Sequence, residues 1–404
     1  MSSERADLRT ANASSTMMDR SAEIASAFET RFGTPPEHIV RAPGRVNLIG
    51  EHTDYNDGWV LPMAIDREVL IAARRRQDTR VYMVALDRRN ATSEFAPDSI
   101  PRDTQNAWSN YIRGVASLLA QNNLRFPGLD MMIAGNVPIG SGLSSSAALL
   151  VAAAVTFQTF GGFALDRVRL AKLAQQAEND FCGVKSGIMD QFISALAQAG
   201  TALLIDCRDL KYEHVPLPRD CEVIVCDTGK RRALSNSAYN TRRAECEEAV
   251  RWLAEKWGEP LRALRDVDYD RFVTVETAMP ALLAKRARHV LTENRRVHAA
   301  VRAARANDPA TLGQLMNQSH ESLRDSYQVS SPELDEMVAS AQAEEGVYGA
   351  RLTGAGFGGC TVNLVRPGET DVLAKKIALG YQARTGLLPS TFIVKASDGA
   401  GIIY

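Results

Sequence analysis

The sequence predicts an α+β protein of two domains. Its 404 residues are enough to bury a full core in each of two domains. Strand and helix patterns follow one another without the regular alternation of a doubly wound parallel sheet. Near residue 210 the pattern changes from strands and apolar helix to charged amphipathic helix. We therefore expect a flexible leader over residues 1–20, an N-terminal domain over 21–210 and a C-terminal domain over 211–404.

Apolar spacing locates the individual elements. Residues 21–32 have the spacing of a helix, with Ile24, Phe28 and Phe32 on one side, and residues 106–120 show the same period. A helix rich in small apolar residues begins after Ser146, and residues 238–345 are mostly helical. Short apolar runs predict strands at residues 59–65, 69–73, 129–137, 201–205, 222–226, 360–365 and 391–395.

Composition indicates a soluble globular protein and argues against two kinds of partner. Hydrophobic residues make up 45% of the chain and charged residues 24%, and the net charge is -1. Such a balance provides no overall field toward nucleic acid or an anionic membrane. The N-terminus lacks the apolar core of a signal peptide, and the longest apolar run, residues 147–155, is too short to span a bilayer. The six cysteines are scattered, so we expect reduced thiols and a cytoplasmic protein.

The segment from Arg41 to Gly58 concentrates polar chemistry after a short apolar burst. Glu51, His52 and Asp54 stand within four positions, followed by Tyr55. Carboxylates and an imidazole so close together are poor core material, but they suit a pocket that accepts hydrogen bonds from several hydroxyls. The alternative is a polar turn after a strand, which the sequence Asn-Asp-Gly at 56–58 also favours.

A second candidate is the small-residue loop between a predicted strand and a predicted helix. Glycines at 140 and 142 let the backbone approach a ligand, and the N–H groups at the helix start favour an anion. Three serines add hydroxyl donors, and one could bind magnesium. Neither the Walker loop nor the dinucleotide fingerprint fits these residues. The alternative is a serine-capped helix after a tight turn.

The third candidate centres on Asp190. It precedes a buried stripe of Phe192, Ile193 and Leu196, and Gly187 leaves space beside the start of that helix. An aspartate there is either a helix cap or a group that accepts or orients a hydroxyl proton. A separate glycine cluster, residues 354–359, precedes a strand, which indicates a loop in close contact with backbone or ligand, or simply a compact turn.

Taken together, these residues resemble a known family of small-molecule kinases, the one that groups galactokinase, homoserine kinase, mevalonate kinase and phosphomevalonate kinase. Three family motifs stand in order at residues 43–55, 138–148 and 352–360. The Gly-Glu-His-Thr-Asp-Tyr segment at 50–55 is similar to the signature of the galactokinase branch. The likeness includes residues 187–191 and 237–239 and covers nearly the whole chain from about residue 35. Leu150 departs from the glutamate frequent there, inside the following helix.

The resemblance implies a two-domain fold with the active site in the interdomain cleft, and ATP-dependent phosphorylation of the anomeric hydroxyl of α-D-galactose with Mg²⁺. Asp190 corresponds to the catalytic aspartate and Arg45 to the arginine beside it. The implied sugar contacts are Glu51, His52, Asp54, Gly187 and Tyr239. The implied cofactor-binding residues are Gly140, Ser141, Gly142, Leu143, Ser144, Ser145, Ser146 and Ala147. Ser146 and Glu178 correspond to the metal positions.

Several alternatives stay open at this point. Asp190 either acts as a base or only orients the hydroxyl, and Arg45 beside it favours the ionised carboxylate. A relative acting on N-acetylgalactosamine, arabinose or another sugar is one rival. A catalytically silent regulator is another, although such relatives lose a Ser-Ala pair that is intact here at residues 146–147. We expect galactose and ATP as ligands, no nucleic acid, no membrane, and a monomer or weak homodimer.

Overall fold

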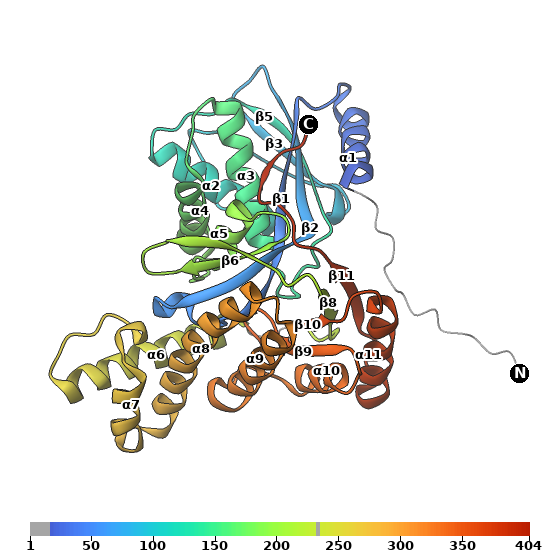
Figure 1. Ribbon diagram of the computed structural model, residues 1–404. Coiled ribbons are helices and arrows are strands. Elements are labelled where there is room, and N and C mark those ends of the chain that lie inside the picture. Colours follow the sequence, from blue (N-terminus) through green and yellow to red (C-terminus); the bar gives the residue numbers. More distant parts are fainter. Residues whose placement is uncertain (1–16, 232–234) are drawn as a thin grey trace, which may run out of the picture.

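The computed structural model describes residues 17–231 and 235–404. Its strands form two sheets, and helices cover both of them (Figure 1). The larger sheet has the order β12-β1-β2-β5-β3-β4, with β6 paired to β2 and β7 to β6. The smaller sheet has the order β11-β8-β10-β9. Strands β3 and β5 pair in parallel, and the other strand pairs of the described residues are antiparallel, so the architecture is α+β as predicted.

The strands of the larger sheet are β1 (His38–Ile49), β2 (Trp59–Arg75), β3 (Val81–Ala85), β4 (Ala91–Phe95), β5 (Leu129–Gly135), β6 (Thr201–Asp206), β7 (Tyr212–Pro216) and β12 (Gly401–Ile402). Those of the smaller sheet are β8 (Glu222–Asp227), β9 (Val347–Leu352), β10 (Cys360–Val365) and β11 (Ser390–Val394). The predicted strands at 59–65 and 69–73 are a single strand, β2. The polar pair at 66–67 interrupts the apolar pattern but not the strand, because β2 pairs with β1 on both sides of it.

The helices of the first half are α1 (Met17–Phe32), α2 (Asn110–Gln121), α3 (Ser145–Gly161), α4 (Arg167–Gln176) and α5 (Met189–Leu196). Those of the second half are α6 (Ser235–Trp257), α7 (Tyr269–Val275), α8 (Ala281–Arg305), α9 (Pro309–Ser322), α10 (Pro332–Gln342) and α11 (Thr370–Thr385). In the described part of the chain, no helix is long and apolar enough to cross a membrane. Residues 1–16 of the predicted leader lie outside the described residues, and α1 begins at Met17.

Helix α3 is the central helix of the first half. Its alanines, among them Ala148, Ala152 and Ala153, are fully buried, and their small side chains let the helix lie close to β1 and β2. Because α3 packs against these strands, its N-terminus is held near the end of β1 where the polar segment begins. This packing places the serine loop and the polar segment on opposite sides of one space.

The smaller sheet joins the two halves. Val223 and Val225 of β8 face a core shared with β1, α8 and α9, whereas Ile224 and Cys226 face α10 and α11. This period of two is expected for a strand buried on both faces. The chain end crosses back to the larger sheet, where β12 pairs with β1. The predicted boundary at residue 210 remains a prediction, and β7 just beyond it pairs with β6 of the larger sheet.

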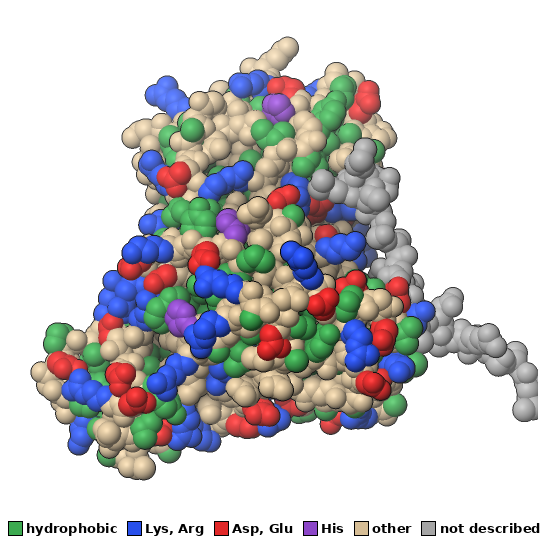
Figure 2. Space-filling model, viewed as in Figure 1, with side chains coloured by type: hydrophobic (Ala, Val, Ile, Leu, Met, Phe, Trp, Pro, Cys, Tyr) green, Lys and Arg blue, Asp and Glu red, His purple; other side chains and the backbone are tan. Residues whose placement is uncertain are grey.

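The face shown in Figure 2 carries both signs of charge side by side. Lys and Arg side chains are interspersed with Asp and Glu over both halves of the molecule, in keeping with the net charge of -1. Any anion site must therefore be built locally.

Candidate active site

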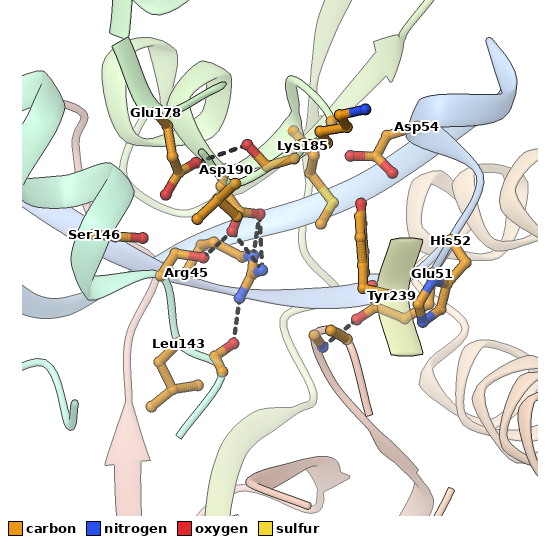
Figure 3. Close-up of a pocket in the computed structure, with 18 of the residues that line it drawn as sticks. Arg45, Glu51, His52, Asp54, Leu143, Ser146, Glu178, Lys185, Asp190 and Tyr239 are labelled. Carbon is orange, nitrogen blue, oxygen red and sulfur yellow. Dashed lines mark hydrogen bonds and ion pairs between the residues drawn. The ribbon is translucent and has the colours of Figure 1, made fainter. Parts of the chain in front are cut away.

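A cavity of about 230 Å³ lies where the first half of the chain, helix α6 and the glycine cluster at residues 354–359 meet (Figure 3). Five separate segments line it, so it depends on the tertiary fold rather than on one motif. The polar segment after β1, the serine loop and residues 178–190 supply most of the wall. The lining residues are Arg45, Glu51, His52, Asp54, Gly140, Gly142, Leu143, Ser144, Ser145, Ser146, Glu178, Val184, Lys185, Ser186, Gly187, Met189, Asp190, Tyr239, Asn240, Gly354 and Ala355.

A sharp turn after β1 presents the acidic side chains to the cavity. Gly50 has φ +97°, and a Cβ there would lie 2.7 Å from the carbonyl oxygen of Trp59. His52 adopts the left-handed region at φ 61°, which is unusual for a non-glycine residue. A short 3₁₀ turn, η1 (Asp54–Asn56), follows. The predicted polar turn therefore exists, and the side chains of Glu51, His52 and Asp54 line the cavity from it.

Asp190 and Arg45 form a two-pronged ion pair at the centre of the cavity. Arg45 Nε donates to Asp190 Oδ1 and Arg45 Nη2 to Oδ2, both at 2.8 Å. The Ser144 hydroxyl also donates to Oδ2, and Arg45 Nη1 donates to the Gly142 carbonyl. Helix α5 starts at Met189 with Ile188 as its N-cap. Asp190 therefore directs its carboxylate toward Arg45 and the serine loop instead of capping its own helix.

The position of Arg45 is set by an irregularity in β1. The pairing of β1 with β2 shifts between Pro43 and Arg45, and such bulges re-aim the following side chain. Gly44 lies within this shift. A Cβ there would come within 2.7 Å of the Leu143 carbonyl oxygen, so only glycine lets the serine loop lie against the strand.

Asp54 lies across the cavity from the serine loop, and its environment disfavours charge. Burial raises its pKa to about 7, and the negative charges of Asp190 and Glu51 add to this shift. Gly187 packs directly against its carboxylate. A Cβ at Gly187 would come within 1.7 Å of Asp54 Oδ2, so any other residue would displace the aspartate.

The aromatic side of the cavity is built by His52, Tyr55, Tyr239 and Tyr327. His52 Nδ1 lies 2.7 Å from the Tyr55 hydroxyl, which is 2.8 Å from the hydroxyl of Tyr327. The ring of Tyr239 stacks at a tilt 5.6 Å from that of His52. These contacts fix the His52 ring at the cavity wall.

Three residues of the serine loop have left-handed backbone conformations before the helix starts. Gly140 and Gly142 have φ 73° and 89°, and Ser144, the residue before α3, has φ 64°. Leu143 is buried and anchors the loop. The first N–H groups of α3 therefore lie at the cavity, which favours an anion there. Ser141 and Ala147 do not line it, since the Ser141 hydroxyl bonds to the Pro138 carbonyl and Ala147 is buried in α3.

Glu178 lies in the π-helical turn η4 (Ala177–Cys182) behind the serine loop. Burial raises the pKa of its carboxyl, and hydrogen bonds from Ser186, Ser146 and Gln191 counteract that shift. Ser146, Glu178 and Asp190 thus offer hydroxyl and carboxylate oxygens to one cavity, the ligands that Mg²⁺ prefers. In the described ranges no group of three His, Cys, Asp or Glu could hold a metal. A magnesium ion at these oxygens would therefore need phosphate and water as further ligands.

Three features at this site were not predicted from the sequence. Lys185 is an exposed cation on the cavity wall near Asp54 (Figure 3). Arg231, paired with Asp227, lies beside the serine loop, because a Cβ on Gly140 would be 4.0 Å from its Cδ. A neighbouring cavity of about 180 Å³ shares Ser145 and Ser146 with the first. It is lined by Trp108, Tyr111, Leu149 and Ile139, among others.

Known proteins match this chain over nearly its full length. The galactokinase galactose-binding signature matches residues 26–75. The models of the GHMP kinase N-terminal and C-terminal domains match residues 110–198 and 300–382. The galactokinases of Roseiflexus sp. (strain RS-1) and Chloroflexus aggregans (strain MD-66 / DSM 9485) are 51% and 50% identical to it. Each alignment covers 94% of this chain, and 96% and 97% of the respective relative.

Solved structures agree with the sequence matches. The crystal structure of Lactococcus lactis galactokinase complexed with galactose is 35% identical with a TM-score of 0.90, covering 95% of this chain and 99% of that one. Methanococcus jannaschii mevalonate kinase has the same fold at 20% identity, with a TM-score of 0.65 over 90% of this chain and 99% of that one. The two-domain α+β kinase fold expected from the sequence is therefore confirmed. By sequence and by structure, this chain belongs to the galactokinase family of the GHMP kinases.

Proposed function

We propose that this chain transfers the γ-phosphoryl group of ATP to the anomeric hydroxyl of α-D-galactose, giving galactose 1-phosphate and ADP. The observation that carries the proposal is the arrangement of one cavity. Carboxylates that can accept hydrogen bonds from hydroxyls line one side, and a helix N-terminus suited to an anion lines the other. The Asp190–Arg45 pair lies between them. Family membership supports the same reaction.

The sugar side of the cavity is suited to hold and orient hydroxyls. Glu51 and Asp54 accept hydrogen bonds, and His52 and Tyr239 can donate or accept them. A site built to bond each hydroxyl rejects a sugar that lacks or inverts one, because a buried carboxylate is then left without its partner. We assign the sugar contacts to Glu51, His52, Asp54, Gly187 and Tyr239 on this basis.

The phosphate side supplies backbone dipoles and a metal site. The N–H groups at the start of α3 and the loop around Gly142 can bind the phosphates. Ser146 and Glu178 would hold a magnesium ion, which neutralises charge on the β- and γ-phosphates when bound. The neighbouring apolar cavity shares Ser145 and Ser146 with this side, and its aromatic residues suit the base of the nucleotide. We therefore place adenine against Trp108 and Tyr111.

Asp190 and Arg45 carry out the chemistry between the two sides. The sugar hydroxyl must point in line at the γ-phosphorus, and the charge spreading over the phosphoryl oxygens must be neutralised. The Asp190 carboxylate accepts the hydroxyl proton or orients that hydroxyl, and its ion pair with Arg45, 2.7 Å away, fixes its direction. Arg45 also supplies positive charge near the transferred group.

The test is an ADP-release assay with galactose, N-acetylgalactosamine, arabinose and glucose. We expect turnover with galactose at least about 10²-fold above that with glucose, which inverts one hydroxyl. Preferred turnover of N-acetylgalactosamine or arabinose would keep the kinase chemistry and replace the substrate. Absence of sugar-dependent ADP release would contradict the proposed function. We place the reaction in the cytoplasm, since all six cysteines are free thiols.

A further inference from the structure

Arg351, near the end of strand β9 and just before the glycine cluster at residues 354–359, is a cation buried beneath the sugar side of the cavity. It lies in β9, its side chain is 0% exposed, and Nη1 donates to the Asn47 carbonyl at 2.7 Å. Its Nε and Nη2 form no hydrogen bond with any residue that the structure describes. A guanidinium taken out of water needs anions close by, so the neighbouring carboxylates determine what Arg351 does.

Two buried carboxylates face Arg351, and they are not equivalent. Glu293 of α8 already has a cation, because Arg296 Nη2 lies 2.7 Å from its Oε2. Its Oε1 accepts the Gly50 amide at 2.9 Å and the Ser319 hydroxyl at 2.6 Å. Glu51 forms an ion pair with Arg351, whose Nη2 lies 3.6 Å from Oε1. The charge of Arg351 is therefore available to Glu51.

Glu51 is held in place by two groups near the end of β9. Its side chain is 3% exposed, and its Oε1 accepts the Gly354 amide and lies 3.6 Å from Arg351 Nη2. Asp190 pairs with Arg45, and Glu51 pairs with Arg351. Each of these two carboxylates is thus matched by one arginine, whereas Asp54 has no ion pair within 4.0 Å in the described part of the chain.

We propose that Arg351 is a positioning residue for galactose binding, which holds the Glu51 carboxylate in the orientation that faces the sugar. The proposal rests on the proposed function, because it takes galactose as the ligand of Glu51. It assigns β9, which leads into the glycine cluster at residues 354–359, to the sugar side of the cavity. Loss of Arg351 should therefore weaken galactose binding and leave ATP binding nearly unchanged.

A difference between the two substrates and recovery by lysine separate this role from a general loss of packing. Besides Glu51, the charged groups that act most strongly on Arg351 are Glu293 and Arg296 of α8. Those two already pair with each other. Removing Arg351 therefore takes away the cation that pairs with Glu51, so the Glu51 side chain should lose its fixed orientation.

The experiment measures galactose dissociation constants by calorimetry at about pH 8 for wild type, Arg351→Met and Arg351→Lys. Arg113→Met is the matched control, because it removes another buried arginine, which pairs with Asp103 and does not line this cavity. We expect Arg351→Met to weaken galactose binding by about 10²-fold, with Arg351→Lys recovering part of the loss. The Michaelis constant for ATP should change less than about threefold.

Recovery by lysine gives the decisive readout. Lysine restores a positive charge beside Glu51, so Arg351→Lys should recover galactose affinity more than a neutral side chain of similar size does. Arg113→Met should keep the wild-type galactose affinity. A folded Arg351→Met protein with wild-type galactose affinity would overturn the proposal, as would equal losses in galactose and ATP binding.

A double variant covers the case in which Arg351→Met does not fold. If the arginine acts through Glu51, then Glu51→Gln with Arg351→Met should fold and bind galactose no more weakly than Glu51→Gln alone. Additive losses in the double variant would overturn the proposal, as would a folded Arg351→Lys protein that weakens galactose and ATP binding equally. Failure of the proposed function is distinguishable, because the wild-type protein would then bind no galactose at any pH.

Discussion

The two sides of the central cavity present different chemical groups to their ligands. The serine loop presents backbone N–H groups and hydroxyls, and its shape depends on positive φ angles at Gly140, Gly142 and Ser144. The turn after β1 presents charged side chains, held by Gly187 and by buried arginines beneath. Figure 3 shows the Asp190–Arg45 pair between them. An anion is therefore met by backbone dipoles without net charge, and neutral hydroxyls are met by carboxylates.

This difference predicts a separation in kinetics. Changes on the sugar side should alter the galactose constants, changes on the loop side should alter the ATP constants, and changes to the central pair should alter turnover. Variants of the central pair and of each side can break that separation, and the central pair should show the largest effect.

Asp190→Asn tests the central pair. We expect turnover to fall by about 10²–10⁴-fold, the range for loss of a general base, while galactose and ATP still bind. The fold should persist, because asparagine can still accept a hydrogen bond from Arg45. Single-turnover phosphoryl transfer and circular dichroism measure the two quantities. A folded Asp190→Asn protein with near-normal turnover would remove Asp190 from the mechanism.

Gly187→Ala tests the sugar side through a steric change. The new Cβ would lie 1.7 Å from Asp54 Oδ2, so the carboxylate must move away. A displacement of about 1 Å can cost about 10²-fold, and we expect that loss in galactose affinity with an ATP constant close to wild type. Gly401→Ala is the matched control, since a Cβ there meets nothing within 4 Å. Equal losses for both substrates would mean that the two sides are not independent.

The raised pKa of Asp54 predicts that galactose binding and the stability of the folded protein both depend on pH. Its pKa is raised to about 7, so galactose hydroxyls must bind a carboxyl that is half protonated at neutral pH. We expect galactose affinity to fall about tenfold per pH unit below 7, with proton release on binding near pH 6.5. Calorimetry in two buffers of different ionisation enthalpy measures that release.

The effect of pH on stability is opposite in sign to its effect on galactose affinity. A carboxyl whose folded-state pKa is raised favours the folded protein at low pH, and this contribution is lost as the pH rises through about 7. Asp54→Asn should therefore stabilise the sugar-free protein at pH 8, by on the order of 1–4 kcal/mol, while raising the galactose constant more than the ATP constant. Thermal unfolding at pH 6 and 8 checks this. An Asp54→Asn protein less stable than wild type at pH 8 would contradict it.

The smallest effects are expected among the loop serines, and they are unequal. Ser146 lines the cavity near Glu178, whereas the Ser141 hydroxyl bonds to the Pro138 carbonyl within its own loop. We expect Ser146→Ala to raise the Michaelis constant for ATP and the magnesium concentration for half-maximal activity about tenfold. Ser141→Ala should change both quantities by less than about threefold. Titration of ATP at several magnesium concentrations measures both. A larger effect at Ser141 would show that the loop reorganises when it binds phosphate.

The motifs could be read from the sequence because each concentrates one kind of chemistry in a short stretch. Glycines and serines at 140–146 and the acidic run at 51–54 are local signals. The cap alternative for Asp190 could not be resolved locally, because its partners Arg45 and Ser144 are distant in the chain. The orientation of Ser141 was also unreadable, since it depends on which way a left-handed loop turns.

Other features depend wholly on tertiary packing. Arg351 looks like an ordinary strand residue, and only the crossing of β9 beneath β1 places it at Asn47 and Glu51. The unbroken strand β2 was predicted as two, because a polar pair reads as a turn when the pairing partner is unknown. The sequence thus indicates what a segment can bind, and long-range contacts determine where it points.

The central claim is that the acidic turn and Asp190 meet at one monosaccharide that faces the nucleotide. A crystal structure with galactose and a non-hydrolysable ATP analogue tests it most directly. We predict the anomeric hydroxyl within hydrogen-bond distance of the Asp190 carboxylate and in line with the terminal phosphate at the serine loop, with ring hydroxyls at Asp54 and Glu51. A galactose whose anomeric hydroxyl points at Asp54, or which binds outside this cavity, would contradict the account.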